Sequence, residues 1–286
     1  MKRYFYILLF FIVIIAPSGS NAATFTDDLG RKVELAKNPE RIISLAPSIT
    51  ETLFYLGLGD KIVGVTDFCN YPPEAKRKTS VGWIISPNVE KIISLKPDLV
   101  LATAEGNRPE IVSTLERVKI NVYVMSPHSI EDILKGIKDV GELTGQAGTA
   151  KVKIAELKQR IYAVKKRGEG AKKARVLYLI STEPLITAGP GSFLHNVIET
   201  VGGENIISSS SNRYPQITME EIVLRDPEVI IVPPDLLENV RSWKNRWGGI
   251  SAIENNRIYS IDPDIISRPG PRIVDGLEEI QRIIRN

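Results

Sequence analysis

Short runs of β-branched and other apolar residues alternate along this chain with stretches of helical periodicity. The runs span residues 41–45, 61–65, 98–102 and 121–125. The stretches between them predict helices over about 50–56, 88–95 and 109–117. This alternation is typical of parallel sheets built from βαβ units, because a parallel strand needs a helical crossover before the next one. We therefore predict an α/β fold.

The stretch between residues 129 and 167 departs from the alternation. Ser129-Ile130-Glu131-Asp132 is a capping box, which predicts a helix that ends near Gly145. A second helix is predicted from about Thr149 to Arg167, where apolar residues recur at helical spacing. These residues are Val152, Ile154, Leu157, Ile161 and Val164. Because the strand pattern resumes at 176–180, we predict two α/β lobes joined by a long helix.

An internal repeat supports the two-lobe prediction. Residues 89–101 align without a gap on residues 219–231, and glutamate, isoleucine and proline recur at matching places. In both copies a predicted helix is followed by a proline and then by a buried strand. A generic helix-to-strand turn would also produce one short match. The offset of 130 residues, about half the chain, favours a duplicated lobe.

The first 22 residues carry the pattern of an export signal. Lys2 and Arg3 precede an apolar run from Tyr4 to Ala16, and Ser20-Asn21-Ala22 predicts cleavage before Ala23. A membrane anchor is the alternative, but the run is shorter than the roughly 20 residues that span a bilayer. No cysteine follows the run, so we expect a soluble, exported protein without a lipid anchor.

These features divide the chain into four predicted segments. They are a signal peptide (1–22), an N-terminal α/β lobe (23–145), a bridging helix (146–170) and a C-terminal α/β lobe (171–286). Loss of Lys2 and Arg3 with the signal lowers the formal charge from +3 to +1. The single cysteine, Cys69, forbids an intrachain disulfide, so the lobes depend on their apolar cores.

Composition and motifs exclude several classes of function. The near balance of 37 basic and 34 acidic residues weighs against nucleic-acid binding. One cysteine and two histidines, His128 and His195, exclude a multi-cysteine metal site and a three-histidine zinc site. The chain lacks a Gly-x-Ser-x-Gly elbow, a His-Glu-x-x-His motif and a Walker-type phosphate loop. We therefore expect no enzyme and no cofactor, although an α/β enzyme remains a remote alternative.

Aromatic residues follow the predicted strands, at the edge where open α/β sheets bind ligands. They are Phe68, Tyr71, Trp83, Tyr214 and Trp247. Aromatic rings on both lobes can enclose a large, flat or amphipathic ligand, whereas some of them will only cover the core. Glu90 and Glu220 occupy equivalent first turns in the two copies of the repeat. They either stabilise the helix dipole or hold two basic residues of one partner.

Several segments resemble those of a known family, the substrate-binding proteins of ABC importers for iron–siderophores, haem and vitamin B12, and within it the branch that carries vitamin B12. The segments are Arg41–Glu51, Asn70–Ala75, Val89–Val100, Gly202–Ile206 and Arg268–Ile273. The resemblance covers nearly all of the chain after residue 22. It implies two Rossmann-like lobes joined by a single rigid backbone helix, with the ligand held between them.

The resemblance also assigns residues. Glu90 and Glu220 match the glutamates that dock on arginines of the two permease subunits. The positions that match the ligand pocket are Pro47, Phe68, Trp83, Tyr214, Trp247, Asp264 and Arg268. Phe68 and Tyr214 stand where a tyrosine and a tryptophan are expected, and Thr103 replaces another aromatic residue. These departures leave the identity of the ligand open.

We therefore expect a monomeric periplasmic protein that captures cobalamin, a corrinoid, and delivers it to an ABC permease dimer in the inner membrane. Haem or a ferric siderophore is the alternative ligand. Haem would need an iron ligand, for which Tyr71 and Tyr214 are candidates, and an anionic siderophore would need basic residues. Arg108, Arg213 and Arg268 are the basic residues available for that role.

Overall fold

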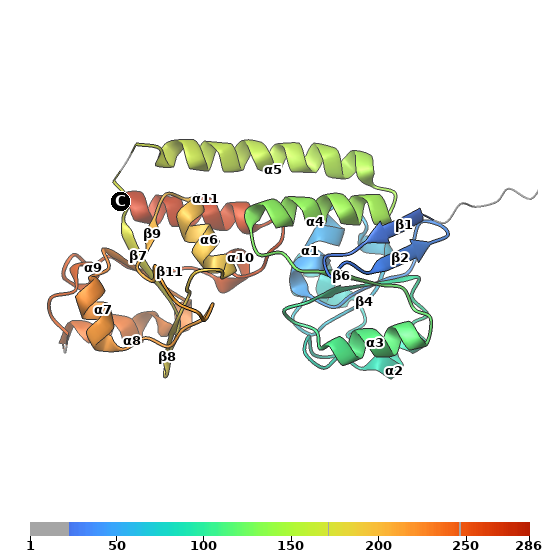
Figure 1. The fold of residues 1–286 in the computed structure, drawn as a ribbon, viewed down its shortest axis with the longest axis horizontal. Coiled ribbons are helices and arrows are strands. Elements are labelled where there is room, and N and C mark those ends of the chain that lie inside the picture. Colours follow the sequence, from blue (N-terminus) through green and yellow to red (C-terminus); the bar gives the residue numbers. More distant parts are fainter. Residues whose placement is uncertain (1–22, 171, 246) are drawn as a thin grey trace, which may run out of the picture.

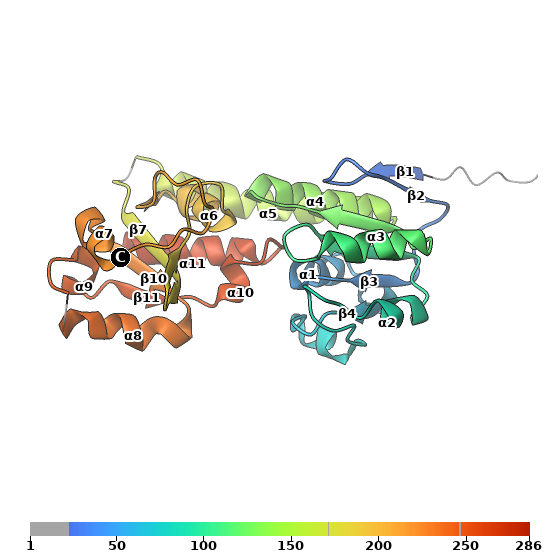
Figure 2. The ribbon, with the colours of Figure 1, turned by 60° about the horizontal axis from the view of Figure 1, so that its bottom comes forward.

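The structure, a computed structural model, describes residues 23–170, 172–245 and 247–286, so the predicted signal peptide lies outside the described residues. Two lobes, each built on a mainly parallel sheet, are joined by the long helix α5 (Ala147–Gly168; Figure 1). The lobes stand side by side when the molecule is turned (Figure 2). The predicted fold class is therefore confirmed.

The N-terminal lobe has a four-stranded parallel sheet in the order β4-β3-β5-β6. Its strands are β3 (Ile42–Ser44), β4 (Ile62–Val65), β5 (Leu99–Thr103) and β6 (Val122–Met125), close to the predicted ranges. Both faces of the sheet are covered, and almost all strand residues are buried as a result. Because β4 and β5 flank β3, the chain order reverses there, and the carboxyl ends of β3 and β5 form a switch point.

Four helices cover this sheet. They are α1 (Pro47–Tyr55), α2 (Val89–Ser94), α3 (Pro109–Arg117) and α4 (Ile130–Leu143), with short 3₁₀ turns η1 (Gly59–Lys61) and η2 (Pro73–Arg77). The Ser129 side chain accepts a hydrogen bond from the Asp132 amide (3.1 Å), as the capping pattern predicts. Helix α1 begins three residues earlier than predicted because Pro47 stands in its first turn, where a proline costs no hydrogen bond.

A hairpin that the sequence analysis did not predict opens the described chain. Its strands are β1 (Ala23–Thr26) and β2 (Lys32–Leu35), which pair antiparallel. The buried carboxylate of Asp27 organises the turn by accepting hydrogen bonds from the amides of Leu29 (3.0 Å) and Arg31 (2.9 Å). Gly30 completes the turn with a φ of 77°, a conformation that glycine adopts without strain.

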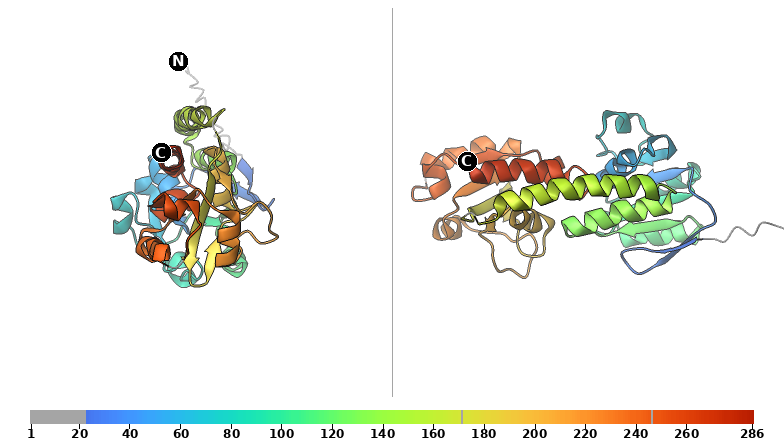
Figure 3. Two further views of the ribbon diagram at one scale, coloured as in Figure 1. Left: turned by 90° about the vertical axis from the view of Figure 1, so that its left-hand side faces the viewer. Right: turned by 90° about the horizontal axis from the view of Figure 1, so that it is seen from above.

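Helix α5 runs along α4 and along α11 (Ile273–Arg285), and thereby spans both lobes (Figure 3). It buries Ala150, Leu157, Ile161 and Val164 against them. Val152, another of the apolar residues at helical spacing, is 58% exposed and lies outside this buried set. In the part of the chain that the structure describes, no helix is both long and apolar enough to cross a membrane.

The C-terminal lobe has its own sheet, in the order β11-β10-β7-β8, with β9 also paired to β7. The strands are β7 (Arg175–Thr182), β8 (Leu185–Thr187), β9 (Glu204–Asn205), β10 (Val229–Val232) and β11 (Ile258–Ser260). Only β8 runs antiparallel. The helices are α6 (Phe193–Thr200), α7 (Met219–Arg225), α8 (Leu237–Ser242), α9 (Ser251–Glu254) and α10 (Pro263–Ile266), with turns η3 (Pro234–Leu236) and η4 (Trp243–Asn245).

The two copies of the internal repeat also share their backbone conformation. Helix α2 is capped by the Asn88 side chain and α7 by the Thr218 side chain, each of which accepts from an amide three residues on. Past the helix, Lys96 and Asp226 both adopt the left-handed conformation, with φ of 47° and 42°. A left-handed residue commonly ends a helix, and the following prolines prevent its continuation. Both copies then enter a central strand, β5 or β10.

Candidate functional site

A cavity of about 380 Å³ lies between the lobes, at the carboxyl ends of the strands. Its N-lobe wall comes from the loops after β3 and β5, which meet at the switch point, and its C-lobe wall comes from α10 and the loop that follows. The lining residues are Ala46, Pro47, Ser48, Phe68, Ile84, Thr103, Glu105, Gly106, Pro263, Asp264, Ser267, Arg268 and Pro269.

Two exposed aromatic rings stand at the N-lobe side of this cavity. Phe68, in the loop after β4, contacts Trp83 edge to face, with 5.5 Å between the ring centroids. The two residues are 47% and 59% exposed, an unusual degree for neighbouring aromatic side chains in a soluble domain. Gly82, with a φ of 95°, allows the tight loop that carries Trp83. The pair offers an apolar surface that the protein itself does not cover.

Asn107, a buried residue that the sequence analysis missed, holds the N-lobe loops together. Its side-chain oxygen accepts from the Thr103 amide (2.8 Å), and its amide nitrogen donates to the carbonyls of Leu45 (3.2 Å) and Ile84 (2.6 Å). Three loops around the cavity therefore depend on one side chain. Asn107 lies four residues past the end of β5, and an asparagine in such a loop is too common to signal this role.

The back of the cleft is closed by ion pairs between the lobes. Glu51 of α1, whose side chain is 2% exposed, accepts from Arg268 (3.1 Å) and from two nitrogens of Arg272 (2.9 and 2.7 Å). Arg268 also pairs with Asp264 (2.7 Å) and donates to the Asn70 side chain (2.7 Å). Hydrogen bonds from guanidinium groups to a buried carboxylate are strong and directional, so this network fixes how the lobes meet.

A second ion pair crosses the cleft at its exposed side. Arg213 of the C-lobe donates to the carboxylate of Glu105 at 2.7 Å, and the His128 ring lies 3.2 Å from the same carboxylate. Tyr214 follows Arg213 in the chain. Burial, and secondarily the negative charge of Glu105, raises the pKa of the Tyr214 hydroxyl. Arg213 and Arg268 therefore both have carboxylate partners.

Of the seven pocket residues expected from the resemblance, six lie in or beside the cavity and one lies apart from it. Pro47, Phe68, Asp264 and Arg268 line the cavity, Trp83 contacts Phe68, and Tyr214 interacts with Glu105 beside it. Trp247 is half-buried and packs against the apolar cluster of the C-lobe, apart from the cavity lining. The lining residues Ser48, Glu105, Ser267 and Pro269 were not among the sequence-based candidates. They are polar or small, and only the fold brings them together.

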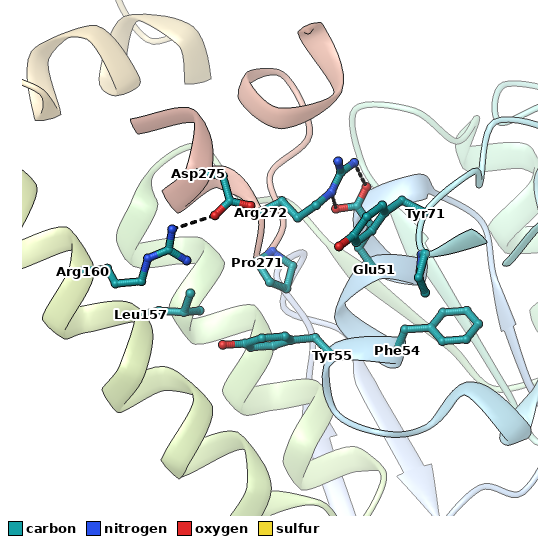
Figure 4. A pocket seen from close by; sticks show the side chains of 10 residues that line it. Glu51, Phe54, Tyr55, Tyr71, Leu157, Arg160, Pro271, Arg272 and Asp275 are labelled. Atoms are coloured by element: carbon teal, nitrogen blue, oxygen red, sulfur yellow. Dashed lines mark hydrogen bonds and ion pairs between the residues drawn. The ribbon is translucent and has the colours of Figure 1, made fainter. Parts of the chain in front are cut away.

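A second cavity, of about 310 Å³, lies behind the ion-pair network, between α1, α5 and the start of α11 (Figure 4). Its charged groups are matched: Arg160 pairs with Asp275 (2.7 Å), and Arg272 pairs with Glu51. Tyr71 faces this cavity, with the Arg272 guanidinium 3.9 Å from its ring centroid. Tyr71 therefore lines this second cavity and not the one beside the aromatic pair.

The two glutamates of the repeat are exposed in the first turns of α2 and α7. Glu90 belongs to the N-lobe and Glu220 to the C-lobe, and both helices lie on the side of the molecule away from α5 (Figure 1). No ion pair involving either glutamate is found among the described residues. They are thus available to basic groups of a partner that spans both lobes.

Two parallel-sheet lobes, one bridging helix and a cleft at the strand ends define a class of proteins that bind a solute between lobes. Comparison with known proteins gives the family. The family model "Periplasmic binding protein" matches residues 42–265. The vitamin B12-binding protein of Vibrio cholerae is 30% identical over 84% of this chain and 87% of its own length. Its crystal structure superposes with a TM-score of 0.80 over 86% of this chain and 97% of that chain.

Other relatives broaden the class. An uncharacterised ABC transporter substrate-binding lipoprotein of Bacillus subtilis is 31% identical over 91% of this chain and 85% of its own. A periplasmic haem-binding protein of Roseiflexus is 25% identical, with a TM-score of 0.77 over 86% of this chain and 97% of that chain. The chain belongs to the periplasmic binding protein family, within the ABC transporter class that includes vitamin B12 and haem binders.

Proposed function

We propose that the protein captures a corrinoid, cobalamin, in the cleft between its lobes and passes it to an ABC permease. The observation that carries the proposal is the exposed Phe68–Trp83 pair beside a cavity whose charges are balanced. A corrin ring is a large, partly apolar macrocycle with amide side chains, so it matches exposed aromatic rings and polar groups without net charge. The vitamin B12-binding relatives support the same ligand.

The charge pattern of the cleft favours this ligand over a siderophore. An anionic ferric siderophore needs unpaired basic groups, yet Arg268, the arginine that lines the cavity, is held by Glu51 and Asp264. Releasing Arg268 would deprive the buried Glu51 carboxylate of one of its two guanidinium partners, which costs free energy. A ligand of small net charge avoids that cost.

Haem is the second candidate, because haem-binding proteins share the fold. A tyrosine that ligates haem iron does so as a phenolate. Neither Tyr71 nor Tyr214 is among the residues that line the cavity between the lobes, and Tyr71 lines the second cavity instead. These positions support a corrinoid over haem.

Calorimetric titration of the purified protein with cyanocobalamin, hemin and a ferric catecholate tests the ligand. We expect heat with cyanocobalamin and none with the other two. Phe68→Ala with Trp83→Ala is expected to weaken cyanocobalamin binding about tenfold or more, because the ring loses its apolar contacts. Tyr162→Ala, an equally exposed aromatic residue on α5, is the matched control and should leave the affinity unchanged. Binding of hemin in place of cyanocobalamin would refute the corrinoid proposal.

Glu90 and Glu220 are proposed to dock on basic residues of the two permease subunits. Their equal positions in the two lobes and their exposure support a partner with twofold symmetry. The double variant Glu90→Ala, Glu220→Ala should abolish uptake in cells while it leaves corrinoid affinity unchanged. Glu131→Ala, another exposed first-turn glutamate, is the control and should transport normally. A double variant that loses ligand affinity would contradict the docking role.

We further propose that the protein acts in the periplasm as a monomer, after cleavage of residues 1–22. The family model and the sequence pattern of the leader support this location. No bound cofactor and no catalytic step are part of the proposal, because capture and release need only binding.

A further inference from the structure

The ion pair between Arg213 and Glu105 joins the two walls of the cleft at its exposed side. Both side chains are about half exposed, at 50% and 44%, and 2.7 Å separate their charged atoms. The pair at the back, around Glu51, is buried by contrast. Water and salt screen an exposed pair, so it breaks easily, whereas the buried one does not. The ion pairs around Glu51 therefore stay closed, whereas the Arg213–Glu105 pair opens with only a small loss of free energy.

The backbones that carry this pair are fixed. The Arg213 carbonyl accepts a hydrogen bond from the Gly189 amide (2.8 Å), and the Glu105 loop is held by Asn107. When the pair opens, the two walls can therefore separate without rearrangement of either loop. Glu105 then keeps a partner, because the His128 ring already lies 3.2 Å from its carboxylate. Arg213 has no other acidic group within ion-pair distance among the described residues.

The cavity beside the pair is small for the ligand proposed above. Its volume of about 380 Å³ is near the lower end of the roughly 300–1,000 Å³ that small-molecule sites occupy. Glu105 forms part of its wall. A macrocycle that carries a nucleotide is larger than this, and Glu105 lies on the wall that it meets, so we expect its entry to separate Glu105 from Arg213.

We propose that the Arg213–Glu105 pair is a latch that the ligand displaces, and that the released Arg213 then binds the ligand's anionic group. This inference rests on the proposed corrinoid function. In cobalamin the anionic group is the phosphate diester that links the nucleotide to the corrin ring. A guanidinium forms strong, directional hydrogen bonds with such a phosphate. The latch thereby selects corrinoids that carry the phosphate over those that lack it.

The affinity test compares cyanocobalamin with dicyanocobinamide, which lacks the phosphate and the nucleotide. Glu105→Gln removes the ion pair, so a ligand no longer loses binding free energy in breaking it. Both ligands should therefore bind about two- to fivefold more tightly. Arg213→Gln opens the latch but removes the phosphate contact. The ratio of cyanocobalamin to dicyanocobinamide affinity should therefore fall about tenfold. Glu279→Gln and Arg282→Gln, an exposed ion pair within α11, are the matched controls and should change neither affinity.

A measurement without ligand keeps this inference separate from the choice of ligand. Spin labels on cysteines at Glu110 of α3 and Glu238 of α8, both exposed, report the distance between the lobes. Glu105→Gln and Arg213→Gln should broaden that distance distribution, and the α11 controls should not. If the wild type binds no corrinoid but the variants broaden the distances, the corrinoid proposal fails and the latch stands. An unchanged affinity ratio would refute the phosphate contact, and unchanged distances would refute the latch.

Discussion

At the scale of single residues, the cleft depends on charged side chains whose partners come from the other lobe. Glu51 and Arg272 are 221 positions apart in the chain, and Glu105 and Arg213 are 108 apart. The first pair is buried and the second exposed. Burial decides their roles, because breaking a buried pair leaves a charge without water or partner. Glu51 therefore holds the lobes together, while Glu105 can exchange partners.

Glu51→Ala should be strongly destabilising. The substitution leaves Arg268 and Arg272 without their shared carboxylate, and such a loss costs about 3–5 kcal/mol of unfolding free energy. Urea unfolding followed by circular dichroism measures the change. Glu238→Ala removes an exposed partner of Arg241 and, as a control, should cost less than about 1 kcal/mol. Equal midpoints for the two variants would contradict the structural role of Glu51.

At the scale of elements, the loop that carries Arg268 and Arg272 is positioned by the packing of α10 against α11. Gly276, in α11, lies so close to α10 that a Cβ atom would collide with the carbonyl oxygen of Ile265. This close approach explains a glycine inside a helix, where it otherwise costs stability. The two helices can meet at this distance only because the side chain is absent.

Gly276→Ala is accordingly expected to lower the unfolding free energy by about 1–3 kcal/mol through overpacking and to weaken ligand binding as the loop shifts. Gly148→Ala in α5 is the matched control. No atom lies within 4 Å of a Cβ at that position, so better helix propensity should raise stability by about 0.5 kcal/mol. Thermal unfolding distinguishes the two variants. A Gly276→Ala protein as stable as the wild type would show that α10 and α11 can separate without loss.

The contact between α5 and α11 predicts a pH effect. The hydrogen bond from Arg160 holds the pKa of the Glu278 carboxyl below its usual value. A lowered native pKa stabilises the fold above the unfolded-state pKa, near 4.3, and the stabilisation is lost as the pH falls through the lowered value. Glu278 is 36% exposed, so its contribution is less than about 1 kcal/mol. The stability difference between wild type and Glu278→Gln should therefore shrink between pH 6 and pH 3. A difference that is the same at both pH values would contradict this account.

At the scale of the whole molecule, α5 sets the orientation of the two lobes. It packs on α4 of the N-lobe and on α11 of the C-lobe, and Arg160 adds ion pairs to Asp275 and Glu278 (Figure 3). A continuous helix of this length bends little, so ligand entry is expected to change the distance between the lobes only slightly. The exposed latch and the aromatic pair are the parts of the cleft free to respond.

The mature protein should begin at Ala23. Expression of the full chain in a Gram-negative host, followed by periplasmic extraction and intact-mass measurement, tests this expectation. Removal of the apolar leader is expected because its small residues precede Ala23 at the position of a signal cleavage site. Retention of residues 1–22 in a membrane fraction would instead support the membrane-anchor alternative.

Much of the fold could be predicted from local patterns. The strands of the N-lobe and helices α2 to α5 lie within a few residues of their predicted ranges, because periodicity and caps act over one or two turns. The β1–β2 hairpin was missed because its strands are short and half exposed. Val152 stands at helical spacing but is exposed, since periodicity marks an apolar residue but not whether a neighbouring element covers it.

The candidate site was less predictable. Resemblance pointed to Pro47, Phe68, Asp264 and Arg268, which do line the cavity, and to Trp247, which packs on the C-lobe core. Nothing local marked Asn107 or Glu105, because a single polar residue in a loop has many uses. The role of Asn107 follows from the N-lobe loops that meet around it, and that of Glu105 from Arg213 across the cleft.

The sequence by itself determined the alternation of strands and helices, the duplicated α2–β5 and α7–β10 units, and the matching positions of Glu90 and Glu220. These properties depend on side-chain periodicity and capping within a few residues. Only the tertiary structure decided that Glu51 meets Arg268 and Arg272, and that Glu105 meets Arg213. Those contacts depend on how α5 packs against both lobes, and short-range propensities do not encode the angle between two lobes.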